Sequence, residues 1–201
     1  MTHLKPSIRA GFLASHGGTS FRVIMERRET YPINIIPAVL ITNNPDAAAL
    51  TVAATYNVPS CAINKKIYGE ENVDRKICEC LIENKAEIVL LTGYMRKIGP
   101  QTLKAFENRI LNSHPALLPK FGGQDMYGRR VHEAVIAADE KTSGVTVHLV
   151  DKEYDTGPIV IQKSISLAPD KTVETLEERV KALEADAYVE AILELSKARL
   201  R

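Results

Sequence analysis

The strongest constraint on the fold is the alternation of short apolar runs with longer amphipathic segments along most of the chain. This alternation is typical of βαβ units, which build a mostly parallel sheet covered by helices on both faces. The run Ile88-Val89-Leu90-Leu91 illustrates it, because a parallel strand buried on both faces has no polar side. The sequence therefore predicts an α/β fold with a mostly parallel central sheet.

The same pattern predicts where the individual elements lie. Strands are expected at 9–15, 35–42, 60–63, 88–91, 110–113, 146–150 and 159–165. Helices are expected at about 20–30, 45–56, 70–84, 100–106 and 172–197. A long glycine-bearing loop should run from Ala116 to about Arg130, and loops of that length are usually functional.

Composition narrows the class of protein. A chain of 201 residues with 45% hydrophobic content is long enough for one sizeable core, so a single domain spanning residues 1–201 is expected. The 26 basic and 25 acidic residues are spread along the sequence, which argues against nucleic acid as a partner. Cys61, Cys78 and Cys80 lack the C-x-x-C spacing of redox or zinc motifs, and no apolar stretch is long enough to cross a membrane. A reduced, cytoplasmic protein is expected, with neither a secretion signal nor a membrane span.

One candidate binding segment is Ser15-His16-Gly17-Gly18-Thr19-Ser20, between the first expected strand and the first expected helix. Backbone N–H groups at a helix N-terminus form a ready site for a phosphate. The segment matches neither the dinucleotide fingerprint nor the nucleoside-triphosphate loop. The alternative interpretation is an ordinary tight turn that uses glycine for its backbone angles.

A second candidate is Asn112-Ser113-His114-Pro115, at the end of an expected parallel strand. Residues i and i+2 of a strand point to the same side, so the Asn112 amide and the His114 imidazole should converge. They would do so at the carboxyl edge of the sheet, where open α/β folds bind ligands. Pro115 restricts His114 to extended backbone angles. The alternative is a strand-end histidine that is simply satisfied by a neighbour.

Three longer segments carry a resemblance to a known family. They are residues 91–96 (Leu-Thr-Gly-Tyr-Met-Arg), 111–119 (Leu-Asn-Ser-His-Pro-Ala-Leu-Leu-Pro) and 150–158 (Val-Asp-Lys-Glu-Tyr-Asp-Thr-Gly-Pro). In this order they resemble the folate-dependent formyltransferases, and the likeness runs from about Arg9 to Leu195. It implies a Rossmann-like sheet and transfer of a formyl group from the co-substrate 10-formyltetrahydrofolate. The implied acceptor is the amine of glycinamide ribonucleotide, in purine biosynthesis, or a related phosphorylated amine.

The resemblance also implies roles for individual residues. The family's catalytic residues fall on Asn112, His114 and Asp155. Its folate-contacting positions fall on two segments: Met95, Arg96, Lys97 and Ile98, and a loop that includes Val150 and Asp151. Its acceptor-contacting positions fall on Ser15, Gly17, Gly18, Thr19, Ser20, Lys181 and Glu184. For the last two the alternative is a solvated pair on one helical face. His132 and His148 match histidines near the family's site, although His148 lies in an alternating strand and has a structural alternative.

Formyl transfer to an amine needs a stabiliser for the oxyanion, an acceptor for the amine proton and a donor for the folate nitrogen. We assign the Asn112 amide and a protonated His114 to the oxyanion. Asp155 would raise the pKa of His114 and manage the amine proton, directly or through a water. This chemistry needs no metal. The partners would be small molecules, and the chain a monomer or a homodimer.

Two departures from the family lie on the acceptor side. The family's phosphate loop commonly reads S-G-x-G-S-N, whereas this chain has His16 at the first glycine and Ser20 in place of asparagine. The loop after His114 is longer, from Phe121 to Arg130. Its Arg129 and Arg130 could grip an acceptor phosphate or carboxylate, or could simply be solvated.

Three other functions compete with formyl transfer to a small amine. Hydrolysis of 10-formyltetrahydrofolate uses the same three residues with water as acceptor, but such hydrolases usually carry an extra N-terminal regulatory domain. Formylation of initiator methionyl-tRNA usually requires an additional C-terminal RNA-binding domain, and the balanced charge argues against tRNA. The third alternative is a non-catalytic folate- or nucleotide-binding sensor on the same fold.

Overall fold

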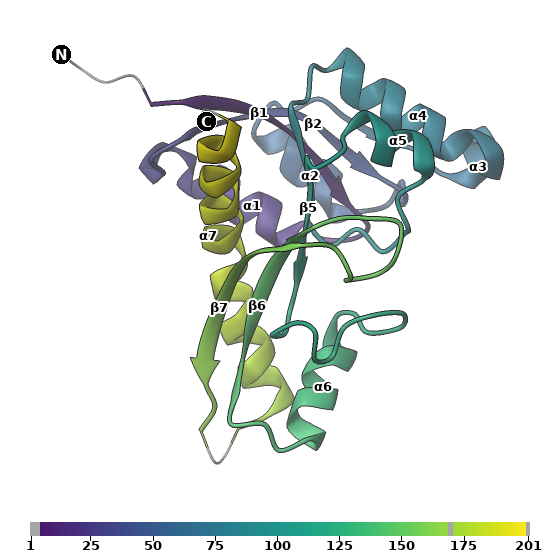
Figure 1. Cartoon of the computed structure of the whole chain (residues 1–201). Coiled ribbons are helices and arrows are strands. Elements are labelled where there is room, and N and C mark those ends of the chain that lie inside the picture. Colours follow the sequence, from purple (N-terminus) through teal and green to yellow (C-terminus); the bar gives the residue numbers. More distant parts are fainter. Residues whose placement is uncertain (1–4, 169–170, 200–201) are drawn as a thin grey trace. The chain divides into compact units, whose positions relative to one another are not determined.

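The computed structural model describes residues 5–168 and 171–199 (Figure 1). The chain forms two compact units, Met1–Leu111 and Asn112–Arg201. Strand β5 (Ile110–His114) begins in the first unit and ends in the second. The single domain expected from the length therefore stays a prediction.

The first unit is a parallel α/β layer. Its strands are β1 (Ser7–Ala14), β2 (Asn34–Thr42), β3 (Ser60–Ala62), β4 (Ile88–Leu91) and the start of β5, and they follow the order β3-β2-β1-β4-β5. Its helices are α1 (Thr19–Arg27), the 3-10 turn η1 (Arg28–Thr30), α2 (Ala48–Thr55), α3 (Lys65–Tyr68), α4 (Glu70–Glu83) and α5 (Pro100–Ala105). Strand β1 pairs in parallel with both β2 and β4, so it is a central strand.

Burial explains the apolar runs of this unit. All four residues of β4 are buried, as the continuous apolar run predicts. Phe12 of β1 and Phe21 of α1 are both fully buried. Their rings pack edge to face with centroids 4.8 Å apart, which fixes the helix against the sheet. Because β1 and β4 are parallel neighbours, their carboxyl ends lie at the same edge of the sheet.

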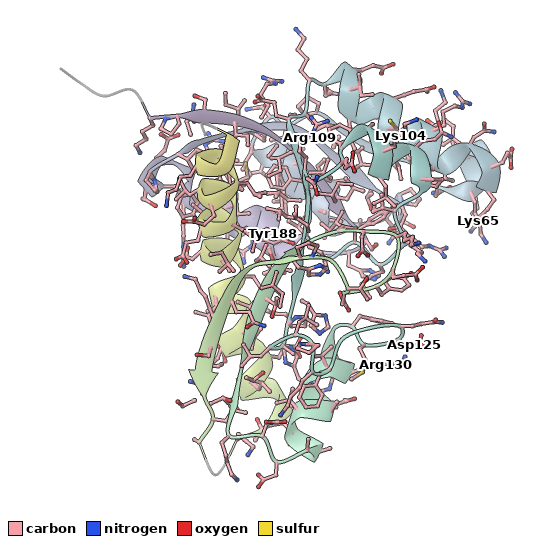
Figure 2. All side chains as sticks on the ribbon, in the orientation of Figure 1. Lys65, Lys104, Arg109, Asp125, Arg130 and Tyr188 are labelled. Carbon is pink, nitrogen blue, oxygen red and sulfur yellow. The ribbon has the colours of Figure 1, made fainter. Side chains whose placement is uncertain are left out.

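The second unit places a long helix on an antiparallel pair. Strands β6 (Thr142–Leu149) and β7 (Ile159–Ser166) are antiparallel, and the second unit has the order β5-β6-β7. Helix α7 (Val173–Arg199) packs against both strands and against α6 (Arg129–Ala137) (Figure 1). Tyr188, on α7, is completely buried (Figure 2). None of the helices in the described part of the chain is long and apolar enough to span a membrane.

The observed elements confirm the expected α/β class and most expected ranges. Strand β6 begins at Thr142 rather than at 146, α2 begins at Ala48 rather than at 45, and two helices were not predicted. Helix α6 was not predicted, because only Val131, His132 and Val135 are buried in its nine residues and so few positions give no clear period. The loop expected to end near Arg130 therefore ends where α6 begins. Helix α3 was not predicted either, since it is a single turn, held by the Asn64 side chain that caps Lys66 and Ile67.

Candidate active site

The second unit brings Asn112, His114 and Asp155 together in one cluster, here called the polar cluster. The Asn112 Nδ2 lies 3.4 Å from Asp155 Oδ1, and the His114 Nδ1 lies 3.3 Å from Asp155 Oδ2. Asn112 and His114 thus reach the two oxygens of one carboxylate from positions i and i+2 of β5, as strand geometry requires. Their side chains converge although Asp155 is 43 residues from Asn112 along the chain.

His148, at the end of β6, is the fourth member of this arrangement. Its Nδ1 lies 2.9 Å from the Leu149 carbonyl oxygen, which only accepts, so Nδ1 carries the hydrogen. The His148 Nε2 lies 3.1 Å from the Asn112 Nδ2 and 3.4 Å from Asp155 Oδ1, so this nitrogen faces both an amide donor and a carboxylate acceptor. His148 therefore contacts both Asn112 and Asp155. His148 thus lies beside the polar cluster, and it also makes a structural hydrogen bond to the backbone of its own strand.

Backbone groups of the segment after β5 form hydrogen bonds with the polar cluster. The His114 Nε2 lies 2.7 Å from the Phe121 carbonyl oxygen, so Nε2 carries a hydrogen and donates it. The Gly123 N–H donates to Asp155 Oδ2 at 3.0 Å. When Nε2 carries the hydrogen of a neutral imidazole, His114 Nδ1 and Asp155 Oδ2 are both acceptors. They form a hydrogen bond only when one further proton lies between them. The pair is thus built to accept a single proton.

The shifts in the pKa values of His114 and Asp155 show how this proton is held. Burial lowers the pKa of His114 below its ordinary value, and the Asp155 charge and the Phe121 carbonyl raise it only in part. Burial thus outweighs the carboxylate before any substrate binds, and a protonated His114 facing the oxyanion stays a prediction. For Asp155, burial raises the pKa, but His148, His114 and the Gly123 N–H together hold it below its ordinary value. The resting pair is therefore a carboxylate beside a neutral imidazole.

Thr146 of β6 anchors the chain that directly follows His114. Its buried hydroxyl donates to the Ala116 carbonyl at 2.6 Å and accepts from the Leu118 N–H at 3.0 Å. The Gln162 side chain donates to the same oxygen at 3.0 Å and to the Leu118 carbonyl at 2.8 Å. These four bonds satisfy the buried backbone of the turn, so the strand end that presents His114 is rigidly supported.

Tyr188 of α7 also supports this strand end. Its hydroxyl accepts the Ser113 N–H at 2.8 Å, between Asn112 and His114. Burial raises the pKa of Tyr188 well above its ordinary value, so the phenol stays neutral. Helix α7 therefore helps to position both polar side chains of β5.

The loop that carries Asp155 is shaped by close backbone approach. A side chain at Gly157 would place its Cβ 1.9 Å from the Leu149 carbonyl oxygen, so only glycine fits there. Asp151 accepts from the Glu153 N–H at 2.9 Å and from the Thr156 hydroxyl at 2.9 Å. Asp155 itself has a φ of 57°, a left-handed conformation that aspartate tolerates. Asp151 thus holds the loop through local bonds, while Val150 beside it is half-buried.

The first unit joins two other predicted segments through Ser15. The Ser15 hydroxyl donates to the Asn43 side chain at 2.5 Å and accepts the Met95 N–H at 2.8 Å. Both partners lie within the protein and Ser15 is 1% exposed, so its hydroxyl supports the turn, and a contact with the acceptor stays a prediction. Met95 begins the segment of residues 95–98, of which 95, 96 and 97 are exposed and Ile98 is buried.

The turn before α1 leaves some of its predicted residues open to solvent. Gly17 and Thr19 are exposed, as is His16, whereas Gly18 and Ser20 are buried. Gly18 is the N-cap of α1 with a φ of 60° and makes no side-chain cap hydrogen bond. An anion could be held there by backbone groups and the Thr19 side chain.

The two residues of α7 expected to contact the acceptor lie on its surface side, and their contact with an acceptor stays a prediction. Lys181 is exposed and donates to Glu177 at 2.5 Å, one helical turn away, while Glu184 is half-buried. Arg129 of α6 bonds Glu133 at 3.1 Å and also Glu174. The Arg130 guanidinium lies over the Tyr127 ring, 5.3 Å from its centre. These cations thus have protein partners that an acceptor would have to share.

Comparison with known protein families matches residues 8–192 to the family described as formyl transferase. The chain belongs to the formyl transferase family. It is 36% identical over 183 residues to the phosphoribosylglycinamide formyltransferase of Bacillus subtilis, covering 90% of this chain and 91% of that protein. The Haemophilus influenzae protein of the same name is 31% identical over 190 residues, covering 94% of this chain and 87% of that protein.

Solved structures agree with this assignment. Glycinamide ribonucleotide transformylase 1 from Symbiobacterium toebii superposes with a TM-score of 0.84 at 34% identity, covering 92% of this chain and 86% of that one. Phosphoribosylglycinamide formyltransferase from Bacillus halodurans gives a TM-score of 0.81 at 35% identity, covering 93% and 94%. The resemblance, the fold class and the expectation of a formyltransferase enzyme are confirmed.

Sequence reasoning missed the backbone contacts of the polar cluster. The Phe121 carbonyl and the Gly123 N–H act through main-chain atoms, which leave no mark on residue type. Thr146 gave a signal that was overlooked, since a threonine between valines on a buried strand needs hydrogen-bond partners. Within residues 5–168 and 171–199 no group of side chains could hold a metal ion, and the metal-free chemistry stays a prediction.

Proposed function

We propose that this chain transfers the formyl group of 10-formyltetrahydrofolate to the amine of glycinamide ribonucleotide, a step of purine biosynthesis. The observation that carries the proposal is the polar cluster of Asn112, His114 and Asp155 in a chain of the formyl transferase family. Two N–H donors and one carboxylate meet there at the end of β5. This is the donor set that acyl transfer to an amine requires.

The oxyanion that forms when the amine attacks the formyl carbon needs donors already in place. The Asn112 amide and the His114 Nε2–H are the two candidates, and both are held by protein partners in this structure. Binding of the formyl group would exchange one of these internal bonds for a bond to the formyl oxygen. Removing one such donor from an enzyme typically lowers kcat by about 10²–10³.

The proton of the attacking amine needs an acceptor, and the resting His114–Asp155 pair has room for one. A proton taken up between Nδ1 and Oδ2 makes the imidazole cationic, so the charge appears as the oxyanion develops. Return of that proton to the departing folate nitrogen would restore the resting pair. The lowered pKa of His114 favours this release.

The substrate-contacting residues are proposed by family likeness. The folate would contact Met95, Arg96, Lys97 and Ile98 and the loop containing Val150 and Asp151. The phosphate of the acceptor would bind at the turn formed by Ser15, Gly17, Gly18, Thr19 and Ser20, of which Ser15 and Ser20 are buried. The other groups of the acceptor would contact Lys181 and Glu184. We further propose that the protein works in the cytoplasm as a monomer or homodimer on small molecules alone, without nucleic acid, membrane or metal.

Spectrophotometric release of tetrahydrofolate, with and without glycinamide ribonucleotide, tests the proposal. Release that depends on the acceptor supports transfer. Release without acceptor would establish hydrolysis instead, and tight folate binding without release would establish a sensor. Asn112→Ala should lose acceptor-dependent release, whereas the matched change Asn34→Ala, at an exposed site on β2, should retain it.

A further inference from the structure

Two cysteines of the first unit face each other outside the polar cluster. Cys61 lies on β3 and Cys80 on α4, and their sulfur atoms are 3.4 Å apart although 19 residues separate them in sequence. Both side chains are half-buried, so small solutes can reach them. The third cysteine, Cys78, turns elsewhere, with its Sγ 3.9 Å from the Gln101 carbonyl.

The two sulfurs are chemically unequal. The thiol hydrogen bond from Cys80 lowers the pKa of Cys61, while the same bond and burial raise the pKa of Cys80. Thiolates rather than thiols are the nucleophiles of sulfur chemistry. Burial and the charges of Asp74 and Glu79 raise the pKa of Cys78. Cys61 is thus the cysteine most ready to react, with Cys80 beside it.

We propose that Cys61 and Cys80 form a reversible intramolecular disulfide when the protein meets a peroxide. The sulfurs are 3.4 Å apart and a disulfide bond is about 2.05 Å, so they need to approach by only about 1.4 Å. The two sulfurs already face each other, one from β3 and one from α4. The site lies in the first unit and does not depend on the proposed formyl transfer.

The reaction balances with hydrogen peroxide as the only oxidant. The Cys61 thiolate attacks one peroxide oxygen, an S–O bond forms, the O–O bond breaks, and hydroxide leaves to take up the proton that Cys61 had lost. The Cys80 sulfur then displaces the hydroxyl from Cys61, forming the S–S bond and releasing a second water with the Cys80 proton. Two thiols are oxidised by two electrons and one peroxide is reduced to two waters. A dithiol reductant reverses the change by exchange.

The test is to treat the whole protein with hydrogen peroxide, alkylate the remaining thiols and identify the peptides by mass spectrometry. Trypsin leaves Cys78 and Cys80 on one peptide, so a second protease that cuts after Glu79 is needed to separate them. The expected result is a Cys61–Cys80 peptide pair lighter by two hydrogens, with Cys78 alkylated and with dithiothreitol restoring both thiols. The bond closes a loop of 19 residues, so the midpoint temperature should rise by several degrees.

Three variants make the outcome decisive. Cys78→Ser should form the same bond. Cys80→Ser should instead accumulate sulfenic acid on Cys61, trapped by a dione reagent, and Cys61→Ser should give neither product. The proposal is overturned if Cys61 and Cys80 both remain alkylatable after peroxide has oxidised free cysteine in the same tube. A disulfide that involves Cys78, or one that joins two chains, would overturn it equally.

Discussion

Replacement of Thr146 by valine removes a single buried hydroxyl and almost nothing else. Valine has the shape of threonine, and residue 146 is completely buried on β6. The hydroxyl donates to the Ala116 carbonyl and accepts from the Leu118 N–H and the Gln162 side chain. Gln162 keeps its bond to the Leu118 carbonyl in the variant. The Ala116 carbonyl and the Leu118 N–H would then be left buried without this partner.

The magnitude follows from these two groups. An unsatisfied buried donor or acceptor costs about 1–3 kcal/mol, and a carbonyl with a second lone pair lies at the low end. We therefore expect the free energy of unfolding to fall by about 3 kcal/mol in Thr146→Val. For a chain of this size that corresponds to a drop of roughly 6–12 °C in midpoint temperature. The turn that follows His114 loses its anchor, so kcat should fall as well.

The assay is urea unfolding followed by far-ultraviolet circular dichroism, since the chain has no tryptophan to report by fluorescence. Thr146→Ser is the matched control, because it keeps the hydroxyl and loses one methyl, at a cost of about 1 kcal/mol. A valine variant within about 0.5 kcal/mol of wild type would refute the role given to the hydroxyl. So would a serine variant as unstable as the valine variant.

Three further predictions concern the polar cluster and its surroundings. Asp155→Asn keeps the shape but removes the charge that holds the amine proton, so initial rates of formyl transfer should fall by about 10²–10⁴; a fall below tenfold would contradict this. Burial lowers the pKa of His114 and His132, so the folded state favours their neutral forms and the unfolded state binds more protons. The two histidines contribute their full stabilisation when the pH is above 6.5, the pKa of histidine in the unfolded chain. This stabilisation is lost as the pH falls through their lower pKa values in the folded protein, so the urea midpoint should drop between pH 7 and pH 5. His132→Gln should flatten this drop, and an unchanged slope would count against burial as its cause. Tyr188→Phe leaves the Ser113 N–H without its partner, so the free energy of unfolding should fall by about 1–3 kcal/mol. The rate constant kcat should also fall by a larger factor than KM rises. An unaltered kcat would show that Tyr188 does not position β5 for the reaction.

The sequence predicted the parts of the site that depend on local periodicity. Asn112 and His114 are two residues apart on a strand, so their convergence follows from the strand alone. Asp155 lies 43 residues from Asn112, and no spacing rule brings it there, so it was found only through the family resemblance. Distant pairings of this kind are decided by loop geometry, such as the close approach at Gly157.

Two properties of the site were beyond sequence reasoning for physical reasons. The protonation of His114 depends on how far burial outweighs the Asp155 charge, and the sequence gives no measure of that balance. The contact of Phe121 with His114 uses the carbonyl of a residue that is not glycine and yet has a positive φ. Such a conformation carries no sequence signal, because phenylalanine rarely adopts it.

The most direct test of the central claim follows a labelled formyl carbon from 10-formyltetrahydrofolate in a single turnover. The wild-type protein should move the label to the amine of glycinamide ribonucleotide, and Asn112→Ala should slow this step by about 10²–10³ while folate binding is retained. Label found as free formate, or equal rates for the variant and the wild type, would contradict this claim.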